Sequence, residues 1–326
     1  MPPVEVARDV FLVTLPLPFA LNSVNCYLLR DPDGWTVLDA GLHTAAGEAA
    51  WRSALAELGV APRAIRQIVL THHHPDHYGM AGWLQELSGA PVLLAPREIE
   101  QARATWGLPP GEGDPMLPHF RAHGTPAAVA AGMAVEVARL REATRPHPEP
   151  TPLAAGAVVP MGGRGFTAIH APGHSDGQLL FYDPEDRLLL CGDHVLVKIT
   201  PHIGLWPTSE PDPLGRFLAS LADLVALDVR LALPGHRAPI TAWAARIAEL
   251  RHHHDLRLAA MAAAVAGFGE ASAFEVARAV FPFERFTPHE QRFAVAETIA
   301  HLERLAFAGA LARVEGEVAR YRSTGR

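Results

Sequence analysis

The sequence predicts an α/β protein built from layered sheets and helices, followed by a module made mainly of helices. Two observations predict this class. Apolar runs typical of strands alternate with helical segments over about residues 5–245, and the second half of this region repeats the strand-and-helix order of the first. From about residue 246 the strand-like runs give way to helical ones.

Length and composition agree with this organisation. The chain has 326 residues, of which 49% are hydrophobic and 19% charged, so it can bury a large core and is long for a single domain. We therefore expect two domains, residues 1–245 and residues 246–326.

The beginning of the chain predicts a β-meander. Its first forty residues contain the apolar runs VFLVTLPL, NCYLLRD and WTVLDAG, with the turn-like DPDG before the last of them. The segment GEAAWRSALAELGV then has helical periodicity and ends at glycine, and IRQIVLT returns to a strand that enters a His-rich loop. A further helix and strand follow in AGWLQELSGAPVLLAP.

Residues from about 96 to 155 interrupt this alternation. They contain the helix-like segment AAVAAGMAVEVARLREAT and end in the Pro-rich PHPEPTP. We expect a helical insertion with loops, of the kind that caps a site. Strand-like runs then resume in FTAIHAPGHSDGQ, LLFYD and RLLLCGDHVLV, followed by the helix FLASLADLVAL and the strand RLALPGHR.

The last eighty or so residues predict three helices and a closing segment, ARVEGEVARY, that could form a hairpin. This order is typical of a winged-helix-like module. Residues 246–326 hold eleven arginines and ten acidic residues, whereas a module that reads DNA is expected to be distinctly basic. We therefore expect domain packing or a homodimer contact here. The run His252–His254 lies in a charged helical stretch, and we expect it on a solvated helix face, outside any site.

The net charge and the N-terminal segment indicate which partners and which cellular location to expect. The net charge of −7 disfavours tight binding to a polyanion such as RNA. The N-terminal segment has no basic start before an apolar run, and no apolar stretch approaches the ~18 residues that a membrane span needs. We expect a soluble, cytoplasmic protein without a membrane partner. The two cysteines, Cys26 and Cys191, lie in apolar runs and are expected to be packed thiols.

The strongest functional signal is the run HHHPDH at residues 72–77, which follows an apolar strand-like segment. Residues two apart on an extended backbone face the same way, so His72 and His74 can point into one site while His73 turns aside. The turn that follows can aim the aspartate and the last histidine at a second point nearby. Imidazole and carboxylate are the ligands that zinc accepts where cysteine is absent, and they also suit iron.

Three further residues end strand-like runs in a similar way. His174 in IHAPGHSDGQ, Asp193 in LLLCGDHVL and His236 in LALPGHRAPI each follow a glycine, where the backbone can turn sharply and present a side chain at the edge of a sheet. Together with the first motif, these residues are enough for two metal sites.

This ordered set resembles the metallo-β-lactamase fold family, whose signature reads His-x-His-x-Asp-His followed by a distant His, Asp and His. The resemblance covers about residues 5–245 and implies an αββα sandwich of two mixed sheets with the site at one edge. It implies two divalent metal ions, with zinc as the preferred metal and iron or manganese as alternatives. The implied ligands are His72, His74 and His174 for the first metal, Asp76, His77 and His236 for the second, and Asp193 as the bridge.

The run VLDAG matches the family's first motif. The resemblance therefore implies that Asp39 orients the metal-binding loops through hydrogen bonds without touching a metal. The C-terminal helices are similar to those of the subfamily that carries a C-terminal winged-helix-like domain.

The resemblance implies a metal-dependent hydrolase. Two divalent ions would hold a bridging water and lower its pKa from about 15.7 toward ~7, so that hydroxide can attack a carbonyl carbon or phosphorus. Asp76 and Asp193 are the catalytic candidates, and Asp76 could accept or relay a proton through an oxygen that the metal leaves free.

We expect a small ester, thioester or lactone as substrate, because an acidic chain with a helical insertion suits a capped small-molecule pocket. Lys198, the only lysine, lies five residues beyond Asp193 and could bind a carboxylate or phosphate. Tyr78, His202 and Trp106 are candidates for the pocket lining.

Two alternatives stay open. The first is phosphodiester cleavage, including RNA, because relatives with a similar C-terminal module act on RNA; the negative net charge disfavours it. The second is iron-dependent oxidation of sulfur compounds or reduction of oxygen, disfavoured by the full ligand set and by the lack of a flavin domain.

Overall fold

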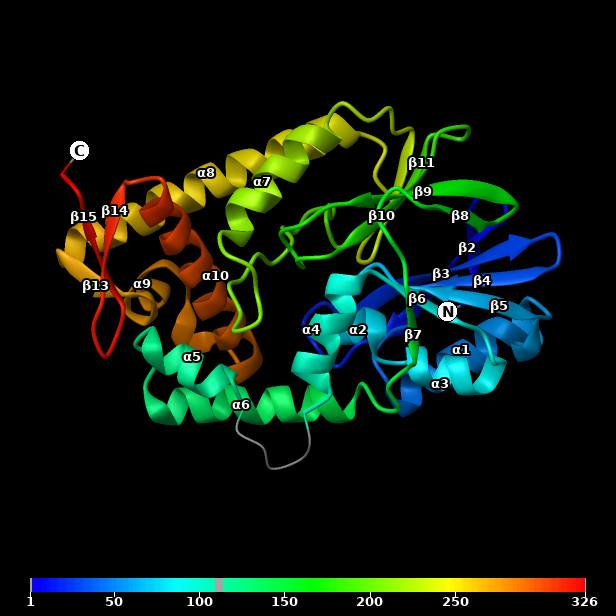
Figure 1. Cartoon of the computed structure of the whole chain (residues 1–326), viewed down its shortest axis with the longest axis horizontal. Coiled ribbons are helices and arrows are strands. Elements are labelled where there is room, and N and C mark those ends of the chain that lie inside the picture. The colour runs from blue at the N-terminus through cyan, green and yellow to red at the C-terminus, as the bar shows by residue number, and fades with distance from the viewer. Residues whose placement is uncertain (1, 109–113, 326) are drawn as a thin grey trace.

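Two large sheets lie toward one end of the molecule in the computed structural model, which describes residues 2–108 and 114–325 (Figure 1). The seven strands of the first sheet lie in chain order, antiparallel from β1 to β4 and parallel from β4 to β7. This arrangement confirms the predicted N-terminal meander. The strands are β1 (Val4–Ala7), β2 (Val10–Pro16), β3 (Ser23–Asp31), β4 (Gly34–Leu38), β5 (Ile65–Val69), β6 (Val92–Leu94) and β7 (Pro150–Pro152).

The second sheet has the order β12-β11-β10-β9-β8, and only its β11–β12 pair is parallel. Its strands all come from the second half of residues 1–245. They are β8 (Val158–Met161), β9 (Arg164–His170), β10 (Leu179–Asp183), β11 (Leu188–Gly192) and β12 (Leu231–Pro234).

Alternation along the strands explains the layers. In β11, Leu190 faces the first sheet, whereas Leu189 packs on the other side against Phe217 of the helix α7 (Pro213–Leu224). In β4, Leu38 faces the second sheet, whereas Val37 packs toward the helices α1 (Ala45–Glu57) and α3 (Ala81–Ser88). Because successive side chains point to opposite faces of a strand, each sheet buries both faces. The result is the predicted αββα sandwich.

The insertion consists of α4 (Pro96–Trp106), α5 (Met116–Ala122) and α6 (Ala127–Glu142), between β6 and β7. Its Pro-rich end differs from the predicted loop, because Pro150–Pro152 pairs with β6 as an edge strand, a position in which proline is tolerated. Residues 109–113, within the predicted insertion, lie outside the described residues.

The C-terminal region has the element order helix, strand, helix, helix, strand, strand. Its small sheet has the order β13-β15-β14, in which β14 and β15 form the predicted closing hairpin. The elements are α8 (Trp243–Phe268), β13 (Glu270–Ser272), α9 (Ala273–Val280), α10 (Pro288–Phe307), β14 (Leu311–Val314) and β15 (Arg320–Ser323).

The insertion and the C-terminal region share one hydrophobic core. Phe120 and Met133 of the insertion pack into the same buried cluster as Met261, Ile299 and Tyr321 of the C-terminal region. Figure 1 shows α5 and α6 beside α9 and α10. The two-domain division at residue 245 stays a prediction, since α8 begins at Trp243 and its first turns pack against α7.

The expectation for the His252–His254 run is wrong at its last residue. His252 is exposed, but His254 is only 2% exposed, and its Nδ1 lies 3.2 Å from Nε2 of His301 on α10. Successive helical residues are about 100° apart, so three neighbours cannot all face solvent on a helix that packs on others. Both cysteines are buried and free, as predicted.

Candidate metal centre

The predicted ligand residues lie where strands of both sheets end. His72 and His74 follow β5, and His74 caps the short helix α2 (Pro75–Tyr78), which presents Asp76 and His77 one turn later. The other three follow strands of the second sheet, as expected from their glycines. They are His174 after β9, Asp193 after β11 and His236 after β12.

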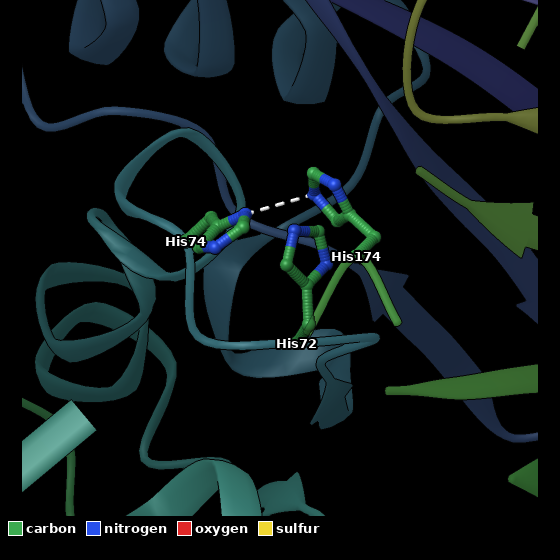
Figure 2. Close-up of side chains that lie close together, drawn as sticks. All are labelled: His72, His74 and His174. Carbon is green, nitrogen blue, oxygen red and sulfur yellow. Dashed lines mark hydrogen bonds between the residues drawn. The ribbon is translucent and has the colours of Figure 1, made fainter. Parts of the chain in front are cut away.

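One cluster consists of His72, His74 and His174. A ligand atom from each lies within 4.8 Å of the others, and Nδ1 of His74 is 2.8 Å from Nε2 of His174. Figure 2 shows the three rings gathered around one point, with the dashed line joining His74 and His174. Three imidazoles with converging nitrogens are a suitable ligand set for zinc.

A second cluster lies beside the first and consists of Asp76, His77 and His236. Nε2 of His236 is 3.2 Å from Oδ2 of Asp76 and 3.2 Å from Oδ2 of Asp193. The Asp193 carboxylate lies between the clusters, since its Oδ1 is 3.3 Å from Nε2 of His77 and its Oδ2 is 3.7 Å from Nε2 of His174. The structure thus brings all seven predicted residues together in two adjoining groups.

The outward ring nitrogens are held by hydrogen bonds. Nδ1 of His174 donates to the carbonyl oxygen of His202, and Nδ1 of His236 donates to that of Ser23, each at 2.8 Å. His77 donates from Nδ1 to Asp39 at 2.8 Å, which agrees with the orienting role predicted for this aspartate. In a neutral ring these bonds place the single N–H proton at Nδ1, away from the centre, so the lone pair of Nε2 faces the centre.

Several inward atoms have no hydrogen-bond partner among the described residues. These buried atoms are Nε2 of His72, His77 and His236 and Oδ1 of Asp193. Unpartnered buried polar atoms are unfavourable unless a ligand satisfies them. These atoms belong to the two adjoining groups of candidate ligands, so the residues fit a pair of divalent metal ions.

The pKa values of the histidines differ between the two clusters. Burial lowers the pKa of His72, His74 and His174, so these rings are neutral and ready to donate electron pairs. Burial alone would also lower the pKa of His236, but Asp193 and Asp76 raise it to about 10. The carboxylates therefore make the second cluster attractive to cations.

Comparison with known proteins agrees with this geometry. The sequence profile of the metallo-beta-lactamase superfamily matches residues 20–236. This chain belongs to the metallo-beta-lactamase superfamily. A second profile, for the metallo-beta-lactamase-like C-terminal domain, matches residues 258–324.

Two relatives extend the comparison. The chain is 27% identical over 303 residues to the probable metallo-hydrolase YqjP of Bacillus subtilis (strain 168), covering 91% of this chain and 92% of that protein. It is 25% identical over 224 residues to the atrochrysone carboxyl ACP thioesterase AgnL7 of Paecilomyces divaricatus. That match covers 68% of this chain but 52% of the fungal protein, so the chain spans about half its length.

Two solved structures share the whole arrangement. A metallo-beta-lactamase family protein from Thermus thermophilus has 36% identity and a TM-score of 0.88, covering 98% of this chain and 100% of that chain. A beta-lactamase domain protein from Burkholderia ambifaria has 30% identity and a TM-score of 0.88, covering 99% and 94%. The predicted fold class is confirmed, including its C-terminal helical region.

A cavity of about 910 Å³ opens onto the metal centre of this superfamily member. Five of the candidate ligands form part of its wall: His74, Asp76, His174, Asp193 and His236. Much of the remaining lining is apolar, with contributions from the first sheet's loops, the insertion and α10. Apolar lining residues include Phe19, Leu42, Trp106, Val137, Ile199 and Phe293.

Two of the four predicted substrate contacts line this cavity. Trp106 lies in its wall and donates from Nε1 to the carbonyl oxygen of His73 at 2.8 Å. His202 also lines it, with Nε2 2.9 Å from the carbonyl oxygen of Phe293.

The other two do not line the cavity. Tyr78 is buried in the core beneath the first sheet, because it is the last residue of α2 and turns away from the ligands. Lys198 is exposed and has a φ of 64°, in a loop that leads its side chain outside the cavity wall. The geometry therefore does not support substrate binding by Tyr78 or Lys198.

Glu98 on α4 is a functional candidate that sequence reasoning missed. Its side chain is fully buried and accepts hydrogen bonds from the backbone nitrogen of His73 at 2.8 Å and from Nδ1 of the same residue at 2.6 Å. It also accepts from Oγ of Ser175 at 2.5 Å and from the nitrogen of Gly177 at 2.6 Å. Glu98 thus ties together the two loops that carry the first cluster, and His73 turns aside as predicted.

Proposed function

We propose that this protein is a dinuclear zinc-dependent hydrolase of small esters, thioesters or lactones. The observation that carries the proposal is the pair of adjoining ligand groups with unpartnered inward atoms, which opens into a largely apolar cavity. When bound, two divalent ions would make hydroxide available near neutral pH and polarise a substrate carbonyl.

The chain's own residues have distinct parts in this proposal. The first metal is assigned to His72, His74 and His174, and the second to Asp76, His77 and His236, with Asp193 between them. Asp76 is also our candidate for proton transfer. Its side chain is 16% exposed and lines the cavity, so it faces the space that a substrate would occupy.

The size and lining of the cavity favour an acyl substrate. About 910 Å³ accommodates a small organic molecule, and an apolar wall suits a hydrocarbon acyl chain. The relative from Paecilomyces divaricatus is named as an acyl-carrier-protein thioesterase, which supports ester or thioester chemistry for this chain as well.

Phosphodiester cleavage is the second candidate that the sequence left open. The net charge of −7 and the apolar wall favour the acyl substrate over it. We also propose that the C-terminal region is winged-helix-like and forms part of the substrate cavity, since α10 lines it. No helix among residues 2–108 and 114–325 is long and apolar enough to cross a bilayer.

The test combines metal analysis with hydrolysis of matched probes. Elemental analysis of protein purified without added metal should find about two zinc ions per chain, and paired ester, thioester and phosphodiester probes should show acyl hydrolysis. Treatment with a chelator should abolish this activity and added zinc should restore it. A protein that contains iron and hydrolyses none of the probes would contradict the proposal. So would a protein that cleaves only the phosphodiester probe.

A matched pair of variants links the metal to the proposed ligands. Asp193→Ala should lose metal and activity, because it removes the carboxylate that lies between the two clusters. Asp223→Ala, an exposed change on α7, should keep both. Full activity in a metal-free Asp193→Ala protein would contradict the assignment of Asp193 as a metal ligand.

A further inference from the structure

Arg292 lies near the start of α10 and forms part of the cavity wall. It is only 6% exposed, and its Nε is buried without a hydrogen-bond partner among the described residues. No acidic side chain in the described part of the chain lies within 4.0 Å of its guanidinium nitrogens. A buried arginine without an anion is an unusual feature.

The surroundings of Arg292 are aromatic. Its guanidinium carbon lies 4.5 Å from the centre of the Phe293 ring and 5.1 Å from that of Trp206. These faces stabilise a cation without neutralising it. Burial lowers the pKa of Arg292 to about 10, so the guanidinium stays charged at neutral pH.

The two nearby carboxylates that act on Arg292 are engaged elsewhere. Asp114 pairs with Arg141 at 3.1 Å, and Glu136 pairs with Arg139 at 2.7 Å. The charge of Arg292 is therefore left for an anion that enters the cavity. A charge held away from water is costly unless a partner and hydrogen bonds compensate it.

Arg292 is connected to the candidate metal centre through Phe293 and His202. The carbonyl oxygen of its neighbour Phe293 lies 2.9 Å from Nε2 of His202, and the carbonyl oxygen of His202 accepts from Nδ1 of His174 at 2.8 Å. All of these residues line the same cavity. Arg292 and the candidate ligands therefore line one cavity.

We propose that Arg292 binds an anionic group, a carboxylate or a phosphate, at the end of the substrate remote from the bond that is cleaved. The planar guanidinium can donate two parallel hydrogen bonds to either group. This inference rests on the proposed acyl hydrolase function. It makes Arg292 a determinant of specificity, and it gives the C-terminal region a direct part in substrate recognition.

The experiment compares two esters on the zinc-loaded full-length protein. 4-Nitrophenyl octanoate and 4-nitrophenyl hemisuberate have the same acyl length, but only the second carries a terminal carboxylate. Wild-type protein should have the higher kcat/KM on hemisuberate. Arg292→Met should lose roughly ten- to hundredfold of kcat/KM on hemisuberate, with little change on octanoate, because one charge-assisted hydrogen-bond pair is removed.

A control variant and a second readout separate recognition from folding. Arg285→Met removes an exposed arginine of the same region and should keep the wild-type preference. Binding is measured by calorimetry with suberic acid monoamide and hexyl phosphate, and with octanamide as the uncharged reference. Affinity for one of the anions should depend on Arg292, and the preferred anion identifies the group.

The outcomes distinguish the two proposals. If wild-type protein hydrolyses both esters equally or prefers octanoate, and binds neither anion more tightly than octanamide, Arg292 does not select an anion and the inference is overturned whether or not the variant folds. If neither ester is hydrolysed but an anion binds in an Arg292-dependent manner, the anion site stands and the proposed acyl hydrolysis fails. A folded Arg292→Met protein that keeps the hemisuberate preference also overturns the inference.

Discussion

The carboxylate of Asp39 accepts a hydrogen bond from Nδ1 of His77 at 2.8 Å, although the two residues are 38 positions apart. The same carboxylate accepts from the backbone nitrogen of Thr71 at 2.8 Å and from its hydroxyl group at 2.9 Å. That hydroxyl lies 2.9 Å from Nδ1 of His72. One buried carboxylate thus orients a histidine of each cluster.

Asp39→Asn should weaken metal binding without removing a ligand. An asparagine can turn its NH2 group toward Nδ1 of His77, which changes the tautomer and leaves Nε2 unsuited to bind metal. We expect a roughly ten- to hundredfold weaker zinc affinity, measured by competition with a chromophoric chelator. Asp223→Asn, an exposed change, is the control. If the Asp39→Asn protein bound zinc as tightly as wild type, Asp39 would have no orienting role at the metal centre.

Gly235→Ala should damage the metal centre through a single methyl group. A Cβ at this position would lie 2.5 Å from Cε1 of His77 and would overlap Oδ1 of Asp193. Contacts this short force the ligands to move, so we expect reduced zinc content and at least a tenfold loss of activity. Gly267→Ala on α8 is the matched control, because a Cβ there meets nothing within 4 Å. Wild-type zinc content in Gly235→Ala would show that the ligands can shift freely.

Glu98→Gln should destabilise the fold and loosen the first cluster. The amide keeps the size of the side chain, but its NH2 group cannot accept from the donors that converge on this carboxylate. A loss of about 2–4 kcal/mol in the free energy of unfolding is expected from urea denaturation. Glu100→Gln, exposed on the same helix, should stay within about 0.5 kcal/mol of wild type. A neutral Glu98→Gln would mean that these bonds are dispensable.

Glu297 on α10 predicts a pH dependence of stability. Burial raises its pKa to about 7, and Arg257, whose Nε lies 3.4 Å from Oε1, only partly offsets this. In the unfolded chain the pKa of a glutamate is about 4.3. Between these values the folded state holds a proton that the unfolded state releases, so the free energy of unfolding contributed by Glu297 falls as pH rises.

Glu297→Gln should reduce that fall. Urea denaturation at pH 5 and pH 8 should show a smaller loss for the variant than for wild type, by up to about 3 kcal/mol. Glu317→Gln, an exposed change in the hairpin loop, should behave like wild type. Identical losses in wild type and Glu297→Gln would contradict the raised pKa.

The candidate metal ligands were predictable because their signals are local. The run at residues 72–77 and the glycines before His174, Asp193 and His236 depend on strand geometry and sharp turns, which short segments of sequence encode. The layered fold was predictable for the same reason, since the periodicity of each apolar run indicates its element. The edge strand at Pro150–Pro152 was not, because its composition is typical of a loop.

The fold class and the seven candidate ligand residues were predictable from the sequence alone. The folded structure was needed to show that Glu98 is buried against His73 and that His254 is buried rather than solvated. It also showed that Arg292 lines the cavity, whereas Lys198 is exposed and does not. The physical reason is that burial and charge pairing depend on neighbours from distant segments. Periodicity along one helix cannot show which face a second domain will cover.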